Sequence, residues 1–265
     1  MPCLYRQPTP SNTLVVKCFC LAIGWIMSAC LSPTSIVGRS TPTYPPPSPT
    51  ANPSAEPTNT AIIEPSLIST SELRGRWLSG IPCSPPCWEG ITPGKTSATE
   101  AMQILTANSL FTRVEGNSSN VNWQMQIMYD DGTSHTWSGD AFITADPSPI
   151  IYAIRTGFPD LALGDAIRVF GKPSHIVVFE ERPPDIGGPY FWHIKVIWAA
   201  QGLTMIASEK TKPRVDEQLM LRGAIYFIPG LEGFRNATNP GILKVVQQWQ
   251  GFADFDAYVT PSSAP

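Results

Sequence analysis

The stretch "WQMQIMYDDGT", residues 123–133, alternates apolar and polar side chains and then reaches an Asp-Gly pair. A period of two is typical of a β-strand with one buried face, and Asp-Gly between strands is a strong hairpin signal. The stretch "WHIKVIWAAQGLT", residues 192–204, has the same layout and ends at its own glycine-containing turn. Each stretch therefore predicts a strand that enters an antiparallel hairpin.

A short amphipathic helix is predicted before each of these strands. The segments "TEAMQIL", residues 99–105, and "GDAIRVF", residues 164–170, carry an acid, an alanine and apolar residues at matching positions. A Ser-x-x-Glu capping box that begins at Ser97 signals the start of the first helix. The Gly171-x-Pro173 motif signals the end of the second helix.

Further strands are predicted around the two hairpins, so that each helix is followed by about four strands. These strands are "LFTRVEG" (110–116), "IIYAIRTG" (150–157), "HIVVFEE" (175–181) and "AIYFIPG" (224–230). The sequence thus predicts an α+β fold made of tandem duplicated helix-plus-antiparallel-sheet units. We expect the first repeat in residues 72–157 and the second in residues 158–235.

The N-terminal region has the layout of an export signal. Residues 1–29 combine a basic start with an uncharged apolar run, as bacterial signal peptides do. Met27-Ser28-Ala29-Cys30 resembles a lipobox, which predicts lipid attachment at Cys30 and places the chain on the outer side of the cytoplasmic membrane or on the cell surface. The alternative is that the apolar run stays uncleaved as a transmembrane anchor.

Residues 30–71 are rich in Pro, Ser and Thr and lack a core-forming pattern. Such a composition cannot bury enough apolar surface to offset the entropy of ordering, so a disordered linker is expected. At the other end, residues 236–265 belong to neither repeat. Apolar residues at helical spacing between Ile242 and Trp249 predict a C-terminal helix followed by a tail.

Two cysteines remain for the folded region, Cys83 and Cys87, in "GIPCSPPCWEGITPGKTS". An exported chain favours a disulfide between them, and a metal site or a redox pair remains as an alternative. The Gly-Lys-Thr that follows is not a phosphate loop, since Gly90 stands one residue too close to Gly94. No nucleotide is therefore expected.

Composition excludes other function classes. The formal net charge is −3, charged residues make up 15% of the chain, and no basic stripe occurs, so no nucleic-acid partner is expected. The three His are not spaced as zinc ligands, and no nucleophile or metalloprotease motif is present. We therefore expect no cofactor, no metal and no enzymatic activity.

The duplicated unit resembles the β-lactamase-inhibitor-protein-like fold, which also underlies small bacterial outer-membrane assembly lipoproteins. The resemblance rests on "PGKTSATEAMQIL" in the first repeat and "LGDAIRVFGKP" in the second, and it covers about residues 90–230. The first repeat lacks the closing Gly-x-Pro and has Thr106-Ala107-Asn108 instead. The resemblance implies a non-catalytic protein that binds other proteins on a concave sheet face or serves as a scaffold.

The strand alternation gives candidates for such a face. The aromatic residues of the strands either pack under the helices or contribute to a surface that anchors a partner. The candidate binding face consists of Trp123, Gln124, Gln126, Trp137, His193 and Lys195. Sequence thus predicts a membrane-anchored lipoprotein that binds a protein or another cell-envelope component, and the alternative is a carbohydrate-active or glycan-binding module.

Overall fold

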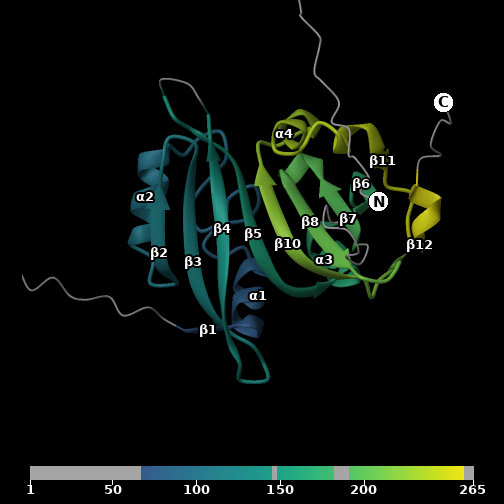
Figure 1. Ribbon diagram of the computed structural model, residues 1–265, viewed down its shortest axis with the longest axis horizontal. Helices are drawn as coiled ribbons and strands as arrows, with labels where there is room; N and C mark the ends of the chain where they lie inside the picture. Colours follow the sequence, from purple (N-terminus) through teal and green to yellow (C-terminus); the bar gives the residue numbers. More distant parts are fainter. Residues whose placement is uncertain (1–66, 145–147, 182–190, 260–265) are drawn as a thin grey trace, which may run out of the picture. The chain divides into compact units, whose positions relative to one another are not determined.

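The structure is a computed structural model that describes residues 67–144, 148–181 and 191–259. The predicted signal peptide, Cys30 and nearly all of the predicted linker lie outside the described residues. The described chain is α+β, as predicted, with few helices and one large mixed sheet of ten strands (Figure 1).

The elements follow one another in two stretches. The first stretch contains β1 (Ile68–Ser69), α1 (Thr70–Leu78), α2 (Ala98–Thr106), β2 (Phe111–Gly116), β3 (Asn120–Met128), β4 (Ser134–Ile143) and β5 (Ile151–Ala162). The second contains α3 (Leu163–Phe170), β6 (His175–Glu181), β7 (Phe191–Trp198), η1 (Ala199–Gln201), β8 (Leu203–Glu209), β9 (Arg214–Val215), β10 (Met220–Phe227), α4 (Leu231–Asn236), η2 (Ile242–Val245), β11 (Val246–Gln248), β12 (Ala253–Asp254) and η3 (Phe255–Tyr258).

The ten strands form one continuous sheet in the order β1-β3-β4-β5-β10-β8-β7-β6-β11, with β2 also paired to β3. All pairs are antiparallel except β1 with β3. The strands before α3 join the strands after it where β5 pairs with β10, so both sets belong to one sheet. The short strands β9 and β12 pair with each other separately.

The hairpin predicted at the Asp-Gly pair joins β3 to β4. The Tyr129 N–H donates to the Thr133 carbonyl at 2.8 Å, and Gly132 adopts a φ of 82°. A positive φ of this size is easy for glycine and strained for other residues. The same signal that indicated the hairpin in the sequence therefore also makes the turn geometrically possible.

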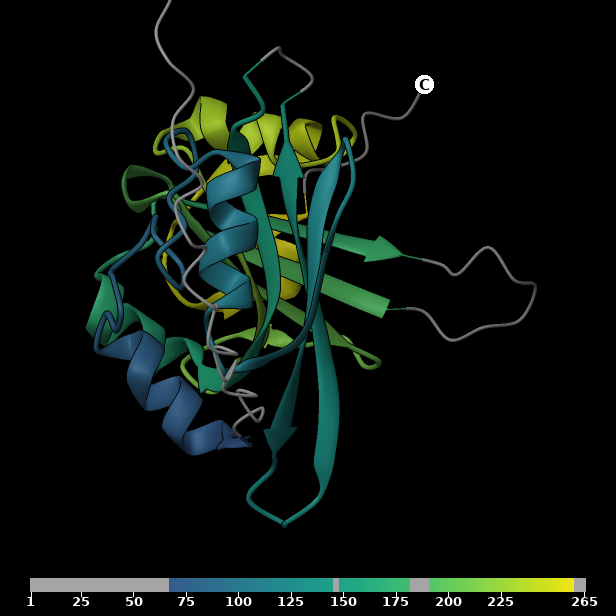
Figure 2. The ribbon, with the colours of Figure 1, turned by 90° about the vertical axis from the view of Figure 1, so that its left-hand side faces the viewer.

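The helices α1, α2 and α3 cover one face of the sheet, and Figure 2 shows α1 and α2 on the same side of the strands. Leu73, Leu105 and Leu163, one from each helix, are fully buried against the core face of the sheet. The Ser97 hydroxyl caps α2 by accepting from the Glu100 N–H at 3.2 Å, as the capping box predicts. The apolar stripe of each helix thus lies against the alternating apolar residues of the strands.

A second apolar cluster lies on the other face of the sheet. Val177, Ile197 and Phe227 alternate along their strands with residues of the main core, so they point the opposite way. Phe234 of α4 is fully buried on them, and η2 packs beside it. The chain after β10 therefore covers one end of this face, and no other described α-helix lies on it.

Two expectations about the boundaries were wrong. The described structure begins before residue 72, because Ile68 is buried and pairs with Ile127 of β3, and α1 starts at Thr70. The helix expected between Ile242 and Trp249 is instead the 3-10 turn η2 followed by the strand β11. The backbone of β11 pairs with the edge strand β6, which overrides the helical spacing of its side chains.

Candidate functional site

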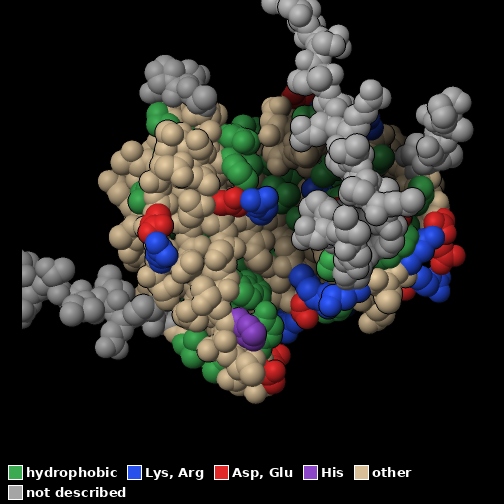
Figure 3. Space-filling view, in the orientation of Figure 1, with side chains coloured by type: hydrophobic (Ala, Val, Ile, Leu, Met, Phe, Trp, Pro, Cys, Tyr) green, Lys and Arg blue, Asp and Glu red, His purple; other side chains and the backbone are tan. Residues whose placement is uncertain are grey.

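The candidate functional site is the face of the sheet opposite α1, α2 and α3, which we call the open face. On β3, Trp123 and Met125 point into the core, whereas Gln124 and Gln126 alternate with them and lie on the open face. Figure 3 views the molecule from this side, and the part over β3 and β4 carries few charged side chains. Most of its polar groups are neutral amides and hydroxyls, such as Ser138 opposite Gln124.

The open face is hollowed in the middle, where β4, β5, β10 and β8 lie side by side. A cavity of about 490 Å³ has Gly157 and Gly223 in its lining. These two glycines face each other across the β5–β10 pair, so neither residue contributes a side chain at this point of the sheet. The charged residues Asp140, Arg155 and Arg222 line the same cavity.

A bidentate ion pair between Arg155 and Asp140 lies beside this hollow. Arg155 donates from Nε to Asp140 Oδ1 at 3.0 Å and from Nη2 to Asp140 Oδ2 at 2.6 Å. The two residues are directly opposite each other in the β4–β5 ladder. The arginine also lies over the Phe142 ring, with 5.3 Å from Cζ to the centroid. Because both hydrogen bonds form, the guanidinium is held in one orientation on the open face.

A second hollow of about 610 Å³ continues from the first over β7 and β6. Its polar centre is His193, whose Nδ1 lies 2.9 Å from Ser208 Oγ and whose Nε2 lies 3.0 Å from Glu181 Oε2. The imidazole stacks on Phe179 at a centroid distance of 5.0 Å. Burial lowers the pKa of His193, with Glu181 opposing the shift, so the ring is neutral at pH 7.

Lys195 lies in the same hollow, two residues along β7 from His193. Its Nζ is 3.4 Å from Thr238 Oγ1 and 5.9 Å from the centroid of the Phe179 ring. Burial lowers the pKa of Lys195, and the positive charge of Arg155 lowers it further. The ammonium group is therefore poorly solvated and lies close to a second cation.

The structure brings four of the six candidate residues onto the open face and separates the other two. Gln124 and Gln126 lie on its β3 side, and His193 and Lys195 lie in the hollow over β7. Trp123 is 1% exposed and packs on Trp88, so its assignment to a binding surface was wrong.

Trp137 is also not part of the open face in the way that was expected. It lies opposite Met125 in the β3–β4 ladder and packs half-buried against the main core. Its Nε1 donates to the Tyr129 hydroxyl at 3.1 Å. Both tryptophans therefore follow the core interpretation of the strand aromatics, because alternation along the strand puts them on the helix side.

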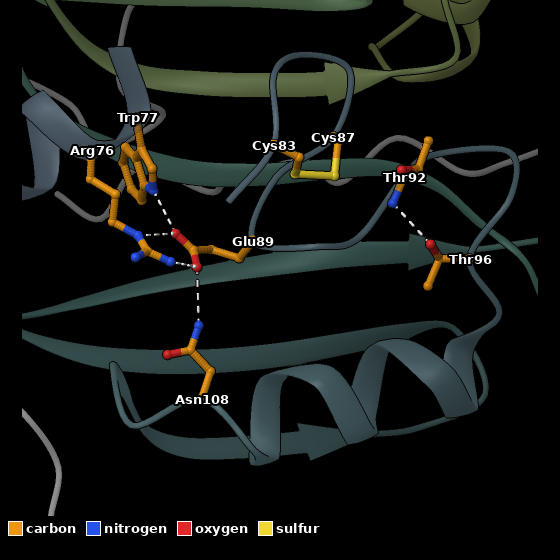
Figure 4. The surroundings of a disulfide bond; sticks show 8 residues. All are labelled: Arg76, Trp77, Cys83, Cys87, Glu89, Thr92, Thr96 and Asn108. Carbon is orange, nitrogen blue, oxygen red and sulfur yellow. Dashed lines mark hydrogen bonds and ion pairs between the residues drawn. A yellow bond between two sulfur atoms is a disulfide. The ribbon is translucent and has the colours of Figure 1, made fainter. Parts of the chain in front are cut away.

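A buried carboxylate, Glu89, was not found as a candidate in the sequence. Its side chain is 0% exposed. It accepts hydrogen bonds from Arg76 at 3.2 and 2.8 Å, from Trp77 Nε1 at 2.8 Å and from Asn108 Nδ2 at 3.0 Å (Figure 4). Because four donors surround it, Glu89 joins α1, the loop after it and the end of α2. The one signal in the sequence was an acid flanked by Trp88 and Gly90.

Figure 4 also shows the disulfide between Cys83 and Cys87, next to this network. A Cβ placed on Gly202, in the turn before β8, would lie 2.9 Å from Pro86 Cβ, so the disulfide loop packs closely on the second half of the sheet. The residues of the apparent phosphate loop form a turn into α2, in which the Thr92 N–H donates to Thr96 Oγ1 at 2.9 Å. The described residues contain no group of His, Cys, Asp or Glu that could hold a metal.

The chain Ser208–His193–Glu181 has the residue types of a nucleophile, a base and an orienting acid. Ser208, however, lies within β8, directly opposite His193 in the β7–β8 ladder. It is not at a strand-to-helix turn, where a nucleophile is exposed beside free backbone N–H groups that could stabilise an oxyanion. The arrangement is therefore a cross-strand hydrogen-bond network on the floor of the hollow.

Comparison with protein-family models, curated proteins and solved structures finds no significant match for this chain. Within the described residues, no helix has the length and apolar character needed to cross a membrane.

Proposed function

We propose that this chain is a non-catalytic binding module of the cell envelope, which receives a protein partner on the open face of its sheet. The observation that carries the proposal is the continuous hollow that crosses β4, β5, β10, β8, β7 and β6 of a single ten-stranded sheet. Concave sites lined by apolar walls and a few oriented polar groups are typical of binding surfaces. Here the polar groups come from different strands of one rigid sheet.

We also propose that the chain is exported and attached to the outer side of the cytoplasmic membrane, or to the cell surface, by a lipid on Cys30. The lipobox at residues 27–30 and the signal-like residues 1–29 support this. A disulfide between Cys83 and Cys87 is compatible with an oxidising compartment. The Pro-rich residues between Cys30 and β1 would then serve as a spacer between the anchor and the sheet.

We further propose that the sheet arose by tandem duplication and is related to the β-lactamase-inhibitor-protein-like fold. The order of elements supports this, because α2 is followed by β2, β3, β4 and β5, and α3 is followed by β6, β7, β8 and β10. The sheet order β2-β3-β4-β5-β10-β8-β7-β6 reads the same way from either edge. The pairing of the last strand of each set would then join the two copies.

The alternative is a carbohydrate-active or glycan-binding module, and two observations weigh against it. None of the seven tryptophans within the described residues is exposed, so these residues offer no aromatic row on which sugar rings could stack. The carboxylates of Asp160 and Glu209 do converge, but both bind Arg222, at 3.1 and 2.9 Å. They are partners of one arginine and do not face each other as a glycosidase acid and base do.

The binding proposal is tested by affinity capture from the cell envelope with the full chain as bait. Ser138→Arg places a long cation at the centre of the open face, and Gln103→Arg places the same side chain on the exposed side of α2. We expect the partner protein to be retained by the wild type and by Gln103→Arg but lost by Ser138→Arg. Retention of a polysaccharide in place of a protein would favour the alternative.

The anchor is tested by Cys30→Ser. We expect this variant to leave the membrane fraction, because one acyl chain and its neighbours supply the membrane affinity of a lipoprotein. A variant that stays membrane-bound and uncleaved would show instead that the N-terminal segment is a transmembrane anchor.

A further inference from the structure

Lys195 is a cation on the floor of the second hollow, and it has no acidic partner among the residues that the structure describes. No carboxylate of the described residues lies within ion-pair distance of its Nζ, although Arg155 and His193 nearby both have one. Its contacts are the Thr238 hydroxyl and the Phe179 ring. A half-buried ammonium without a counter-charge has lost part of its hydration and gained little in return.

The charges around Lys195 come from three strands. Arg155 of β5 adds positive potential, and Glu181 of β6 adds a smaller negative contribution. His193 of β7 already uses Glu181 and is neutral at pH 7. The segment after α4, residues 237–239, consists of Ala, Thr and Asn and contributes no charge to the hollow. Glu180 of β6 also lines the hollow. A negative group that came close to Lys195 would meet a cation that no described carboxylate pairs with, and the positive charge of Arg155 nearby.

Besides these polar groups, Glu180 and Ser208, the hollow has large apolar walls. They consist of Phe142, Phe179, Ile206, Ile225 and Ile242. A ligand that suits this lining has an apolar stem and a terminal anion, as an acidic side chain does. A free inorganic anion would satisfy the ammonium but would leave the apolar walls against water.

We propose that the hollow around Lys195 is a subsite for an acidic side chain of the protein partner, whose carboxylate pairs with the Lys195 ammonium. This inference rests on the proposed function and adds the chemistry of the contact. The partner's carboxylate replaces the water lost by the lysine, and the apolar walls exclude competing solvent. A charge-assisted hydrogen bond in such a site is stronger than an exposed ion pair.

The test is to pan a phage-displayed library of random dodecapeptides on the full chain and to measure the enrichment of Asp and Glu. We expect acidic peptides to be enriched on the wild type and their binding to be lost on Ser138→Arg. For the strongest peptide, replacing its acidic residue by the matching amide should weaken binding about tenfold. The same preference should disappear with Lys195→Met and persist with Lys195→Arg.

Lys172→Met is the matched control, because it removes the same charge from an exposed lysine outside the hollow. The subsite would be refuted if peptides bind the open face without enrichment of Asp and Glu, or if the preference for acidic peptides survives Lys195→Met. The proposed function would remain valid in either case. Recovery of no peptide that depends on the open face would count against the proposed function and the subsite together. Binding of inorganic phosphate at Lys195 without any acidic peptide would reassign the site to small anions.

Discussion

Replacement of Glu89 by Gln is the sharpest test of what holds the start of the folded chain together. The substitution keeps the shape of the side chain and removes its charge. In the wild type, Oε1 accepts from Arg76 Nε and Trp77 Nε1, and Oε2 accepts from Arg76 Nη2 and Asn108 Nδ2. A Gln amide has one oxygen and one NH₂ group. The NH₂ group would take the place of one carboxylate oxygen, and the two donors that bind this oxygen in the wild type would then face a third donor.

The expected cost follows from these contacts. Two hydrogen bonds to a charged group are lost, and each contributes about 1.5–3 kcal/mol. The side chain of Arg76 is 29% exposed, so water partly replaces what this residue loses. We therefore take the lower part of the range and expect Glu89→Gln to lower the free energy of unfolding by about 3 kcal/mol, as for other buried pairs that lose one partner.

The assay is equilibrium unfolding of the full chain in urea at pH 7, followed by tryptophan fluorescence. With a slope of about 2 kcal/mol per molar urea, the midpoint should fall by roughly 1.5 M. Glu115→Gln is the control, because it makes the same chemical change in the Arg113–Glu115 pair, where both side chains are more than half exposed. We expect the control to change stability by less than about 0.5 kcal/mol.

A loss of less than 1 kcal/mol in Glu89→Gln, with an unchanged slope, would refute this reasoning. It would mean that the four donors around residue 89 find other partners at little cost. A loss of the same size in Glu115→Gln would also refute it, because burial would then not distinguish the two carboxylates.

Three further predictions concern packing, the disulfide and pH. Gly139→Ala should destabilise the chain by about 1–3 kcal/mol in the same assay, because its Cβ would lie 2.4 Å from an indole ring and 2.7 Å from a backbone carbonyl. Gly75 in α1 has open space around it, so Gly75→Ala should instead stabilise the chain by up to about 1 kcal/mol. Replacing Cys83 and Cys87 together by Ala should lower stability by roughly 2 kcal/mol, and a reducing agent should then have no further effect on the variant. The pKa of His193 is lower in the folded state than its ordinary value, so the unfolded chain binds more protons below about pH 6.5. The free energy of unfolding should therefore decrease as the pH is lowered below this value, and it should decrease less in His193→Gln.

Local signals in the sequence were enough to predict most of the regular structure. The alternation at 123–129 and the Asp-Gly pair gave β3, its turn and its inward and outward sides. The capping box at Ser97 gave the start of α2, and the glycine after residue 170 gave the end of α3. These features depend on neighbours along the chain, and periodicity and turn chemistry report on such neighbours directly.

The elements that the sequence did not predict depend on partners far along the chain. β1 forms because Ile68 pairs with β3, and β11 forms because its backbone pairs with β6. Neither pairing has a local signal, and in β11 it contradicts the helical spacing of the side chains. Glu89 was missed for the same reason, since its donors come from α1 and from Asn108.

The sequence by itself determined the α+β class, the hairpin between β3 and β4, and the alternation of inward and outward residues along β3. It also supplied the arguments for the proposed export, since the signal-like run and the resemblance to a lipobox are local patterns. Only the tertiary structure decided which outward residues share a surface. His193 and Lys195 meet Arg155 in one hollow because β5 pairs with β10, and β10 continues through β8 to β7. Strand order sets which side chains become neighbours across a sheet, and no single strand's sequence contains that order.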